Sequence, residues 1–335
     1  MLLVGDIGGT KTDLAIYSSE SDERSPLVQK QFHSADYSSF QAIVREFLAE
    51  TAMTITQATF DVAGPVINRR VATTNLPWVM DEDSLARELN LGSVHLMNDL
   101  EAVARAIPIL RKNDVITLNT GEPVAKAAIG VIAPGTGLGQ SFLEWDGSYY
   151  VPRDSEGGHA DFAPTERRQI RLLEYLLSRF DHVSVERVCS GIGIPNIYQY
   201  LRDVENITEN PEIGRQIASS ADPTKTIVEA AISSQDQSPL CRATLEMFIS
   251  ILGSEAGNLA LKVLATGGIY LAGGIVQHTM ALLQESIFMR AFTNKGRFSE
   301  LMMRIPVHAI VTNAALLGVA HYGLQVLKRN SVPGA

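Results

Sequence analysis

The sequence predicts a two-domain α/β protein, and three features of the chain support this prediction. Short apolar strands alternate with helical segments along most of the 335 residues, a pattern typical of α/β folds. A strand, a glycine-rich turn and a second strand occur at residues 2–17 and again at 126–145, each time opening a new α/β region. The chain is also long enough to bury two hydrophobic cores. We place a smaller domain at 1–110 plus about 300–335, and a larger one at 111–299.

The first half of the chain contains the elements of one such domain. An apolar strand enters the first glycine turn, and residues 13–17 alternate out of it as a second strand. The expected elements that follow are a helix at about 37–52, strands at 57–62 and 72–76, a helix near 82–89, a strand at 94–97, a helix at 100–107 and a strand at 113–118.

The second half repeats this organisation. The expected elements are strands at 126–133 and 140–145, a helix at 165–180, short helices and loops over the polar region 203–240, a long helix at 241–265, a strand at 269–272, a helix at 276–292, a strand at 306–311 and a helix at 313–328. The glycines at 267 and 268 end the long helix.

Composition excludes several classes of protein. Apolar residues make up 45% of the chain and charged residues 19%, as in a globular enzyme. The net charge of −9 argues against a nucleic-acid partner. No run of 18 apolar residues occurs, so we expect no membrane span. Cys189 and Cys241 lack metal-ligand spacing and fit a reducing compartment, so we expect a cytoplasmic protein.

Three glycine-rich turns are candidates for nucleotide binding. In the first two turns, backbone N–H groups can surround a phosphate, and an acid in the first turn can hold Mg²⁺ through its waters. In the third turn, the pair Gly273–Gly274 ends a strand and lets a flat ring such as adenine lie against the backbone. The second turn lies between two strands with G-x-G-x-G spacing, which disfavours a dinucleotide-binding fold, and no P-loop motif occurs. Taken singly, each could be an ordinary tight turn. The candidate residues are Gly5, Asp6, Ile7, Gly8, Gly9, Thr10, Gly135, Thr136, Gly137, Gly273 and Gly274.

Asn98 and Asp99 follow the apolar strand at 94–97 and precede a helix. An acid at this position lies at the carboxyl edge of the sheet, where α/β proteins bind ligands. Asp99 could therefore accept a proton from a substrate hydroxyl as a general base. The alternative is that Asp99 only caps the helix.

The loop around Glu156 and His159 places a carboxylate and an imidazole three residues apart across two glycines. These groups could hydrogen-bond a polyhydroxy ligand, whereas a zinc site would need further Cys or His ligands nearby. Glu186 is a third acid on a predicted loop. Each of these residues could also be a solvated surface side chain. A glycosidase pair of carboxylates would leave the glycine turns unexplained.

Taken together and in this order, these segments resemble the actin-like sugar-kinase superfamily and, within it, the bacterial-type glucokinase family that lacks zinc. The matching segments are 5–10, 75–78, 96–103, 134–139, 155–164, 186–191 and 271–275. The related ROK family carries a cysteine-rich zinc motif after its Gly-His pair. In this chain Cys189 lies thirty residues past His159 with no cluster after it, so the zinc-free family is the better match.

The resemblance implies a two-domain actin-like ATPase (ribonuclease H-like) fold with an active-site cleft between the domains. It implies transfer of the γ-phosphoryl of ATP, with Mg²⁺, to the 6-hydroxyl of glucose. Asp99 would be the base, and Asp6 would orient Mg²⁺ through water. The resemblance also favours a homodimer. The residues that would contact the sugar are Asn98, Asp99, Glu156, His159 and Glu186.

Three alternatives remain open from the sequence. The chain could be a kinase for another hexose or an amino sugar. It could be a non-catalytic sugar sensor or regulator, although its acidic charge argues against DNA binding. It could also be an actin-like ATPase, but such a protein would not need the cluster at Glu156 and His159.

Overall fold

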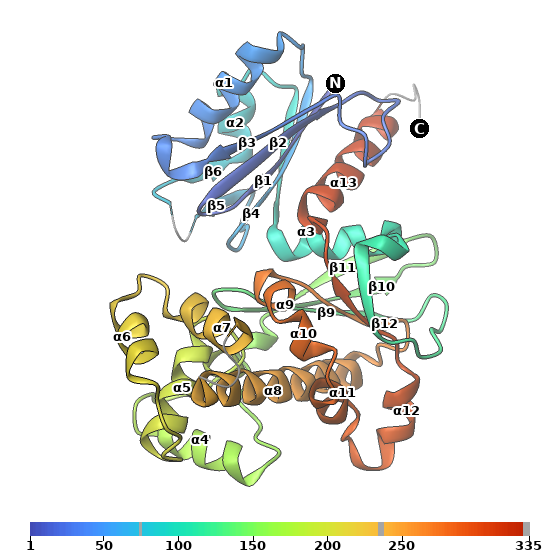
Figure 1. Cartoon of the computed structure of the whole chain (residues 1–335). Helices are drawn as coiled ribbons and strands as arrows, with labels where there is room; N and C mark the ends of the chain where they lie inside the picture. The colour runs from blue at the N-terminus through green and yellow to red at the C-terminus, as the bar shows by residue number, and fades with distance from the viewer. Residues whose placement is uncertain (74–75, 234–237, 331–335) are drawn as a thin grey trace. The chain divides into compact units, whose positions relative to one another are not determined.

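The computed structural model describes residues 1–73, 76–233 and 238–330. The chain divides into two compact units (Figure 1). Unit 1 contains Met1–Leu110 and Thr312–Ala335, and unit 2 contains Arg111–Val311. The sequence prediction put the C-terminal boundary near residue 300. Asn75, which belongs to a predicted strand and to the matching segment 75–78, lies outside the described residues, as do residues 234–237 of the polar region.

Unit 1 is built on a five-stranded sheet with the order β3-β2-β1-β4-β7. Its strands are β1 (Leu2–Ile7), β2 (Lys11–Tyr17), β3 (Val28–His33), β4 (Gln57–Val62) and β7 (Ser93–Asn98). The first two form the expected antiparallel hairpin, and β4 and β7 run parallel to β1. The carboxyl ends of β1, β4 and β7 therefore meet at one edge of the sheet.

Helices cover both faces of this sheet (Figure 1). On one face, α1 (Phe40–Thr51) and α2 (Glu82–Glu88) pack on apolar residues of the strands; on the other lie α3 (Asp99–Ala106) and α13 (Ala314–Asn330). Two short 3-10 helices span Ser34–Asp36 and Ile107–Ile109. These two layers bury separate hydrophobic clusters on either side of the strands.

A small hairpin of β5 (Arg70–Ala72) and β6 (Val79–Asp81) packs on the core of unit 1, where Val71 and Met80 are buried. β5 ends at Ala72, and residues 74 and 75 of the strand predicted at 72–76 lie outside the described residues. The prediction missed β6 and β3. Three residues are too few to show an alternating pattern, and β3 carries polar residues on its exposed positions at the sheet edge.

Unit 2 contains a six-stranded sheet with the order β11-β10-β9-β12-β13-β8. Its strands are β8 (Val115–Asn119), β9 (Ile129–Pro134), β10 (Leu138–Trp145), β11 (Tyr150–Ser155), β12 (Gly268–Leu271) and β13 (Val307–Ile310). An antiparallel hairpin again sits beside two strands parallel to its first member. The order β11-β10-β9-β12-β13 thus repeats β3-β2-β1-β4-β7, which confirms the predicted repeat.

The longest helix of unit 2 is α8 (Pro239–Val263), whose buried residues dominate the core. Figure 1 shows it crossing the unit as one continuous helix. The other helices are α4 (Arg167–Leu177), α5 (Gly193–Asp203), α6 (Pro211–Ser219), α7 (Pro223–Ser233), α9 (Gly274–His278), α10 (Met280–Leu283), α11 (Ser286–Thr293) and α12 (Ser299–Arg304), with 3-10 turns at Lys112–Asp114, Gly157–His159, Val185–Arg187 and Gly296–Phe298.

The single helix predicted at 276–292 is wrong, because the segment forms α9, α10 and α11. Thr279 ends α9, and its hydroxyl donates to the carbonyl of Ile275 at 2.7 Å. Glu285 is extended, with φ −72° and ψ 162°, and this breaks the chain again before α11. The apolar spacing of the segment continues across both breaks, so periodicity alone did not reveal them.

Candidate active site

The tip of the β1–β2 hairpin is held in shape from within unit 1. The N–H of Gly8 donates to the carbonyl of Lys11 at 2.9 Å, and the hydroxyl of Ser34 donates to the carbonyl of Gly8 at 2.9 Å. Gly5 has a different role from the tip glycines. A Cβ there would lie 2.7 Å from the Leu14 side chain and 2.9 Å from that of Phe60. Gly5 therefore allows close packing of the strands beneath the tip.

Asp6 lies near the end of β1 and is partly buried. Its Oδ2 accepts a hydrogen bond of 3.2 Å from the Nδ2 of Asn313, the residue before α13. Burial raises the pKa of Asp6, and the hydrogen bond from Asn313 lowers it in part. The negative charges of Asp13 and Asp99 raise the pKa further. The sequence reasoning missed Asn313, although a polar residue between a strand and a helix is a typical cap.

Asp61 is a second residue that the sequence reasoning missed. It pairs in register with Asp6 on one side and Met97 on the other, and it is 0% exposed. Among the described residues, neither of its carboxyl oxygens has a hydrogen-bond partner of good geometry. Burial raises the pKa of Asp61 well above its usual value, and the neighbouring Asp6 and Asp99 raise it further. A single acid within the apolar run 58–62 was the signal available in the sequence.

Of Asn98 and Asp99, the structure makes Asn98 the helix cap and leaves the Asp99 carboxyl exposed. Asn98 caps α3, because its Oδ1 accepts the N–H of Leu100 at 2.9 Å, and its Nδ2 donates to the carbonyl of Gly64 at 3.0 Å. Asp99 is the first residue of the helix, and its side chain is exposed. The N-cap position predicted as the alternative for Asp99 thus belongs to Asn98.

The pKa of Asp99 is raised despite this exposure. The protein atoms packed around the carboxyl displace part of its water, and this outweighs the hydrogen bonds from Leu100 and Asn98 that favour the anion. A raised pKa brings a carboxylate closer to that of an effective general base at neutral pH.

In unit 2, the turn at 135–137 between β9 and β10 is bonded to the start of α5. The N–H of Gly191 donates to the carbonyl of Gly135 at 2.7 Å, and that of Ile192 donates to Thr136 at 3.3 Å. Glu186 braces the same turn, since its Oε2 accepts the N–H of Leu138 at 2.9 Å. One oxygen of this predicted sugar ligand is therefore already occupied.

Gly273 lies at the end of β12, beside the end of β9. Its φ is +95°, and a Cβ there would lie 2.7 Å from the carbonyl oxygen of Pro134. A side chain is thus disfavoured by both conformation and space. Because β9 and β12 are parallel neighbours, the turn at 135–137 and the pair Gly273–Gly274 lie at the same edge of the sheet.

Glu156 and His159 project from the loop after β11. Their side chains are 86% and 64% exposed, and Oε2 of Glu156 lies 3.9 Å from Nε2 of His159. The loop beneath them is fixed: Gly158 is buried against the carbonyl of Leu138, and the N–H of Gly157 donates to the Ser155 hydroxyl at 3.1 Å. The two side chains are therefore free to bind a ligand from a rigid base.

The donor set around Asp6 suits Mg²⁺ with few protein ligands. Within the described ranges, no group of three or more His, Cys, Asp or Glu side chains could hold a metal ion. Mg²⁺ commonly takes one or two carboxylates and completes its shell with water and substrate phosphates. Asp6 fits that requirement.

Across the same described ranges, the chain has no helix with the length and apolar character needed to cross a membrane.

The glucokinase family model matches residues 3–326. This chain belongs to the glucokinase family. It is 42% identical to a glucokinase of Nostoc punctiforme over 96% of this chain and 98% of the relative. It is 36% identical to a glucokinase of Shigella dysenteriae, covering 97% of each chain.

Solved structures agree with this assignment. A glucokinase from an Antarctic psychrotroph superposes with a TM-score of 0.83 at 31% identity, covering 97% of this chain and 98% of that one. A ROK-family glucokinase from Streptomyces griseus, solved with glucose and AMPPNP, shares the fold with a TM-score of 0.63 at 19% identity, covering 97% of this chain and 99% of that one. The predicted family and the actin-like ATPase fold are confirmed. The prediction that this chain is a sugar kinase is confirmed as well.

Proposed function

We propose that this chain uses ATP and Mg²⁺ to phosphorylate D-glucose at its 6-hydroxyl, giving glucose 6-phosphate and ADP. One observation carries the proposal. In a chain that matches the glucokinase family model over residues 3–326, an exposed Asp99 stands at the same sheet edge as the glycine hairpin with Asp6. A proton acceptor and a phosphate-binding turn on one edge are what phosphoryl transfer to an alcohol requires.

Asp99 is the proposed general base. Its carboxylate is accessible, so a substrate hydroxyl can reach it, and its raised pKa favours proton transfer from an alcohol. Proton removal leaves the sugar oxygen as the nucleophile that attacks the γ-phosphorus. The leaving group is then ADP, and the proton stays on Asp99 until solvent removes it.

The proposal assigns the sugar to Asn98 and Asp99 of unit 1 and to Glu156, His159 and Glu186 of unit 2. A bound pyranose needs a partner for each buried hydroxyl, and carboxylates, an amide and an imidazole supply both donors and acceptors. Glu156 and His159 have the greatest freedom for this role, because both are exposed. Asn98 and Glu186 already make bonds within the protein.

The triphosphate is assigned to the two glycine turns, at 5–10 and 135–137, and the adenosine to Gly273 and Gly274. Backbone N–H groups at such turns bind phosphate oxygens. Bound Mg²⁺ would offset the charge on the phosphates. Asp6 is held in place by Asn313 and would orient the water molecules of that ion.

ATP consumption measured with and without glucose tests the function. We expect turnover only with glucose and Mg²⁺, and its loss in EDTA. Asp99→Asn should lower kcat at least about 100-fold while leaving the melting temperature unchanged. Asp36→Asn, at an exposed aspartate of the same unit, is the control and should keep the wild-type kcat. Glucose-independent ATP hydrolysis would favour an actin-like ATPase, and a panel of hexoses would reveal a different sugar substrate.

A further inference from the structure

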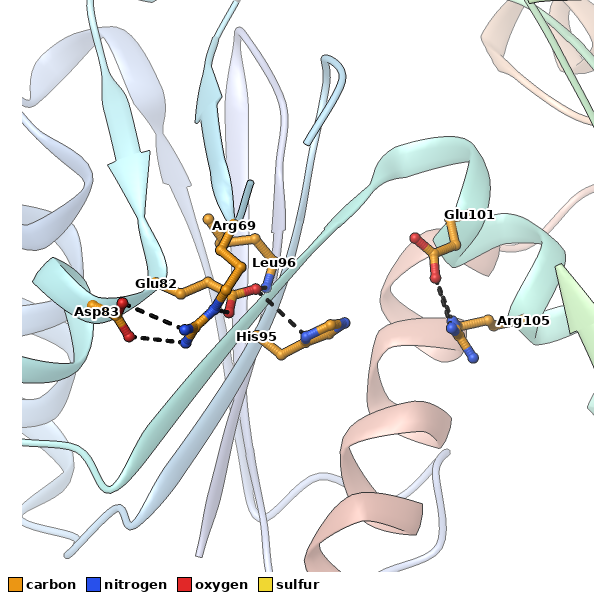
Figure 2. Close-up of polar contacts among 7 residues, drawn as sticks. All are labelled: Arg69, Glu82, Asp83, His95, Leu96, Glu101 and Arg105. Carbon is orange, nitrogen blue, oxygen red and sulfur yellow. Dashed lines mark hydrogen bonds and ion pairs between the residues drawn. The ribbon is translucent and has the colours of Figure 1, made fainter. Parts of the chain in front are cut away.

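Glu82 is a buried charged residue in unit 1 that the proposed function does not use. It is the first residue of α2, and its side chain is 6% exposed. Its Oε1 accepts the backbone N–H of Leu96 at 2.8 Å, and its Oε2 accepts the Nε of Arg69 at 2.7 Å. Figure 2 shows this carboxylate between the arginine and strand β7. One side chain thus connects a helix, a strand and a turn.

The bond to Leu96 compensates for a missing strand. β7 is the last strand of its sheet and pairs with β4 on one side. An unpaired N–H on the other side would leave the buried Leu96 without a partner, and buried backbone groups need one. Leu96 precedes Asn98 by two residues and Asp99 by three. The Glu82 carboxylate therefore fixes the strand directly before the proposed base.

Arg69 attaches a second segment to the same carboxylate. Asn68 and Arg69 have φ values of 51° and 64° and form the two-residue turn between Ile67 and Arg70. Asn tolerates this left-handed conformation better than Arg does. Arg69 nevertheless occupies it, and its guanidinium also pairs with Asp83 at 2.9 Å. The N–H of Glu82 in turn donates to the Arg69 carbonyl at 3.1 Å.

The segment from Gly64 to Arg69 is thereby attached to β7 at both ends. Arg69 reaches the strand through Glu82, and the carbonyl of Gly64 accepts the amide of Asn98 at 3.0 Å. A shift of Glu82 would move the strand, the segment and Asn98 together. Displacements of about 1 Å in an active site can cost about 100-fold in rate.

Aromatic and ionic contacts around His95 also hold β7. His95 lies 3.5 Å from Glu82 Oε1, and its ring packs on Tyr322 with centroids 4.7 Å apart. The guanidinium of Arg105 lies over the Tyr322 ring, 4.3 Å from its centroid. Arg105 also pairs with Glu101 at 2.6 Å (Figure 2). Both residues are on α3, the helix that Asp99 begins. Within this network, Glu82 accepts the hydrogen bond from the backbone of β7.

We propose that Glu82, supported by Arg69, is a positioning residue for phosphoryl transfer: it fixes β7 and the segment 64–69 so that Asn98 and Asp99 hold the attacking hydroxyl. This inference rests on the proposed function. Glu82 does not contact the substrate; it acts through the hydrogen bond that it accepts from the Leu96 N–H.

Substitutions at position 82 separate positioning from simple stabilisation. Glu82→Met keeps the length of the side chain and removes both acceptors, whereas Glu82→Gln keeps an acceptor for Leu96. We expect Glu82→Met to lower kcat/KM for glucose at least about 10-fold with little change in KM for ATP. In Glu82→Gln, which keeps the acceptor for Leu96 but loses the ion pair with Arg69, kcat/KM for glucose should fall only about 3- to 10-fold. Glu50→Met, in the exposed pair of Glu50 and Lys30, is the matched control and should behave like wild type.

Amide hydrogen exchange gives a readout that does not depend on activity. In Glu82→Met the Leu96 amide should exchange at least about 10-fold faster than in wild type, and in Glu82→Gln it should not. Faster exchange together with wild-type kcat/KM would overturn the positioning role and leave Glu82 as a stabilising residue. Unchanged exchange of the Leu96 amide in Glu82→Met would show that Glu82 does not hold β7 and would overturn the proposal.

Arg69→Gly keeps the proposal testable if Glu82→Met does not fold. Glycine suits the left-handed turn, so this variant removes the guanidinium without adding strain. We expect kcat/KM for glucose to fall about 3- to 10-fold, and wild-type kinetics here would count against the proposal. A wild-type chain without glucose-dependent ATP use overturns the proposed function; an active wild type with an equally active Glu82→Met overturns the positioning role alone.

Discussion

Replacing Asp61 with asparagine is expected to stabilise unit 1 at neutral pH. The carboxyl is 0% exposed, lies beside Asp6 and has no well-formed hydrogen bond among the described residues. Leaving a buried polar group without a partner costs about 1–3 kcal/mol, and more for a charged group. Asparagine has the same shape, carries no charge and can donate to Asp6. We therefore expect a gain of about 1–3 kcal/mol, or roughly 2–12 °C in melting temperature.

The gain should depend on pH in a direction that the structure fixes. Burial raises the pKa of Asp61 well above the 3.8 of an exposed aspartate. Below pH 3.8 the carboxyl is protonated in both the folded and the unfolded chain. As the pH rises above 3.8, the unfolded chain loses this proton while the folded chain retains it, so folding becomes less favourable. Stability keeps falling as the pH rises until the pH passes the pKa of Asp61 in the folded chain. Asparagine does not titrate, so the variant does not lose stability in this way.

Thermal unfolding of wild type and Asp61→Asn, followed from pH 4 to pH 8, measures the effect. The difference in melting temperature should be smallest near pH 4 and should grow towards neutrality. Asp36→Asn, at an exposed aspartate of the same unit, controls for the loss of one charge and should change stability by less than about 0.5 kcal/mol. A difference for Asp61→Asn that is independent of pH, or a variant less stable at pH 7 than at pH 4 relative to wild type, would refute this reasoning.

Further predictions concern the two glycine turns and the sugar loop. Glu156→Gln and His159→Ala should each raise KM for glucose about 10-fold with KM for ATP unchanged, because a lost hydroxyl partner weakens sugar binding; steady-state kinetics test this, and an unchanged KM for glucose would remove the loop from the site. Asn313→Ala should raise the Mg²⁺ concentration needed for half-maximal rate, since Asp6 loses its hydrogen bond; an unchanged Mg²⁺ titration would contradict this role. Gly273→Ala should destabilise unit 2 by about 1–3 kcal/mol, because φ is +95° and Pro134 blocks the Cβ; calorimetry showing no loss would contradict it.

The elements that the sequence predicted are those with local signals. The hairpin tips follow from glycines between apolar strands, and Asp99 follows from its place after the strand at 94–97. The chemistry around the base depends instead on residues far apart in the chain. Asp6 meets Asn313 across 307 positions. No periodicity or spacing connects such residues, because sheet order and helix packing decide which of them come together.

Glu82 illustrates the same limit at shorter range. In the sequence it reads as an ordinary acid in the first turn of a helix, where the helix dipole favours negative charge. Its function as an acceptor for the Leu96 N–H follows from β7 being an edge strand, and that is a property of the sheet order. The edge strand β3 was missed for a related reason, since exposed strands keep polar residues and give weak apolar patterns.

Asp61 lies in β4 and Asp99 directly follows the neighbouring strand β7, yet their positions give them functions that cannot be exchanged. β4 lies inside the sheet between β1 and β7, so Asp61 is covered, whereas Asp99 follows the end of an edge strand and is exposed. A general base must reach the hydroxyl it deprotonates, and a carboxyl without exposed surface cannot. Asp61→Asn should therefore change the stability and its pH dependence while kcat stays within about 3-fold of wild type. Asp99→Asn should instead lower kcat and leave the stability unchanged. Loss of turnover in Asp61→Asn equal to that in Asp99→Asn would show that the buried carboxyl takes part in the proton transfer after all.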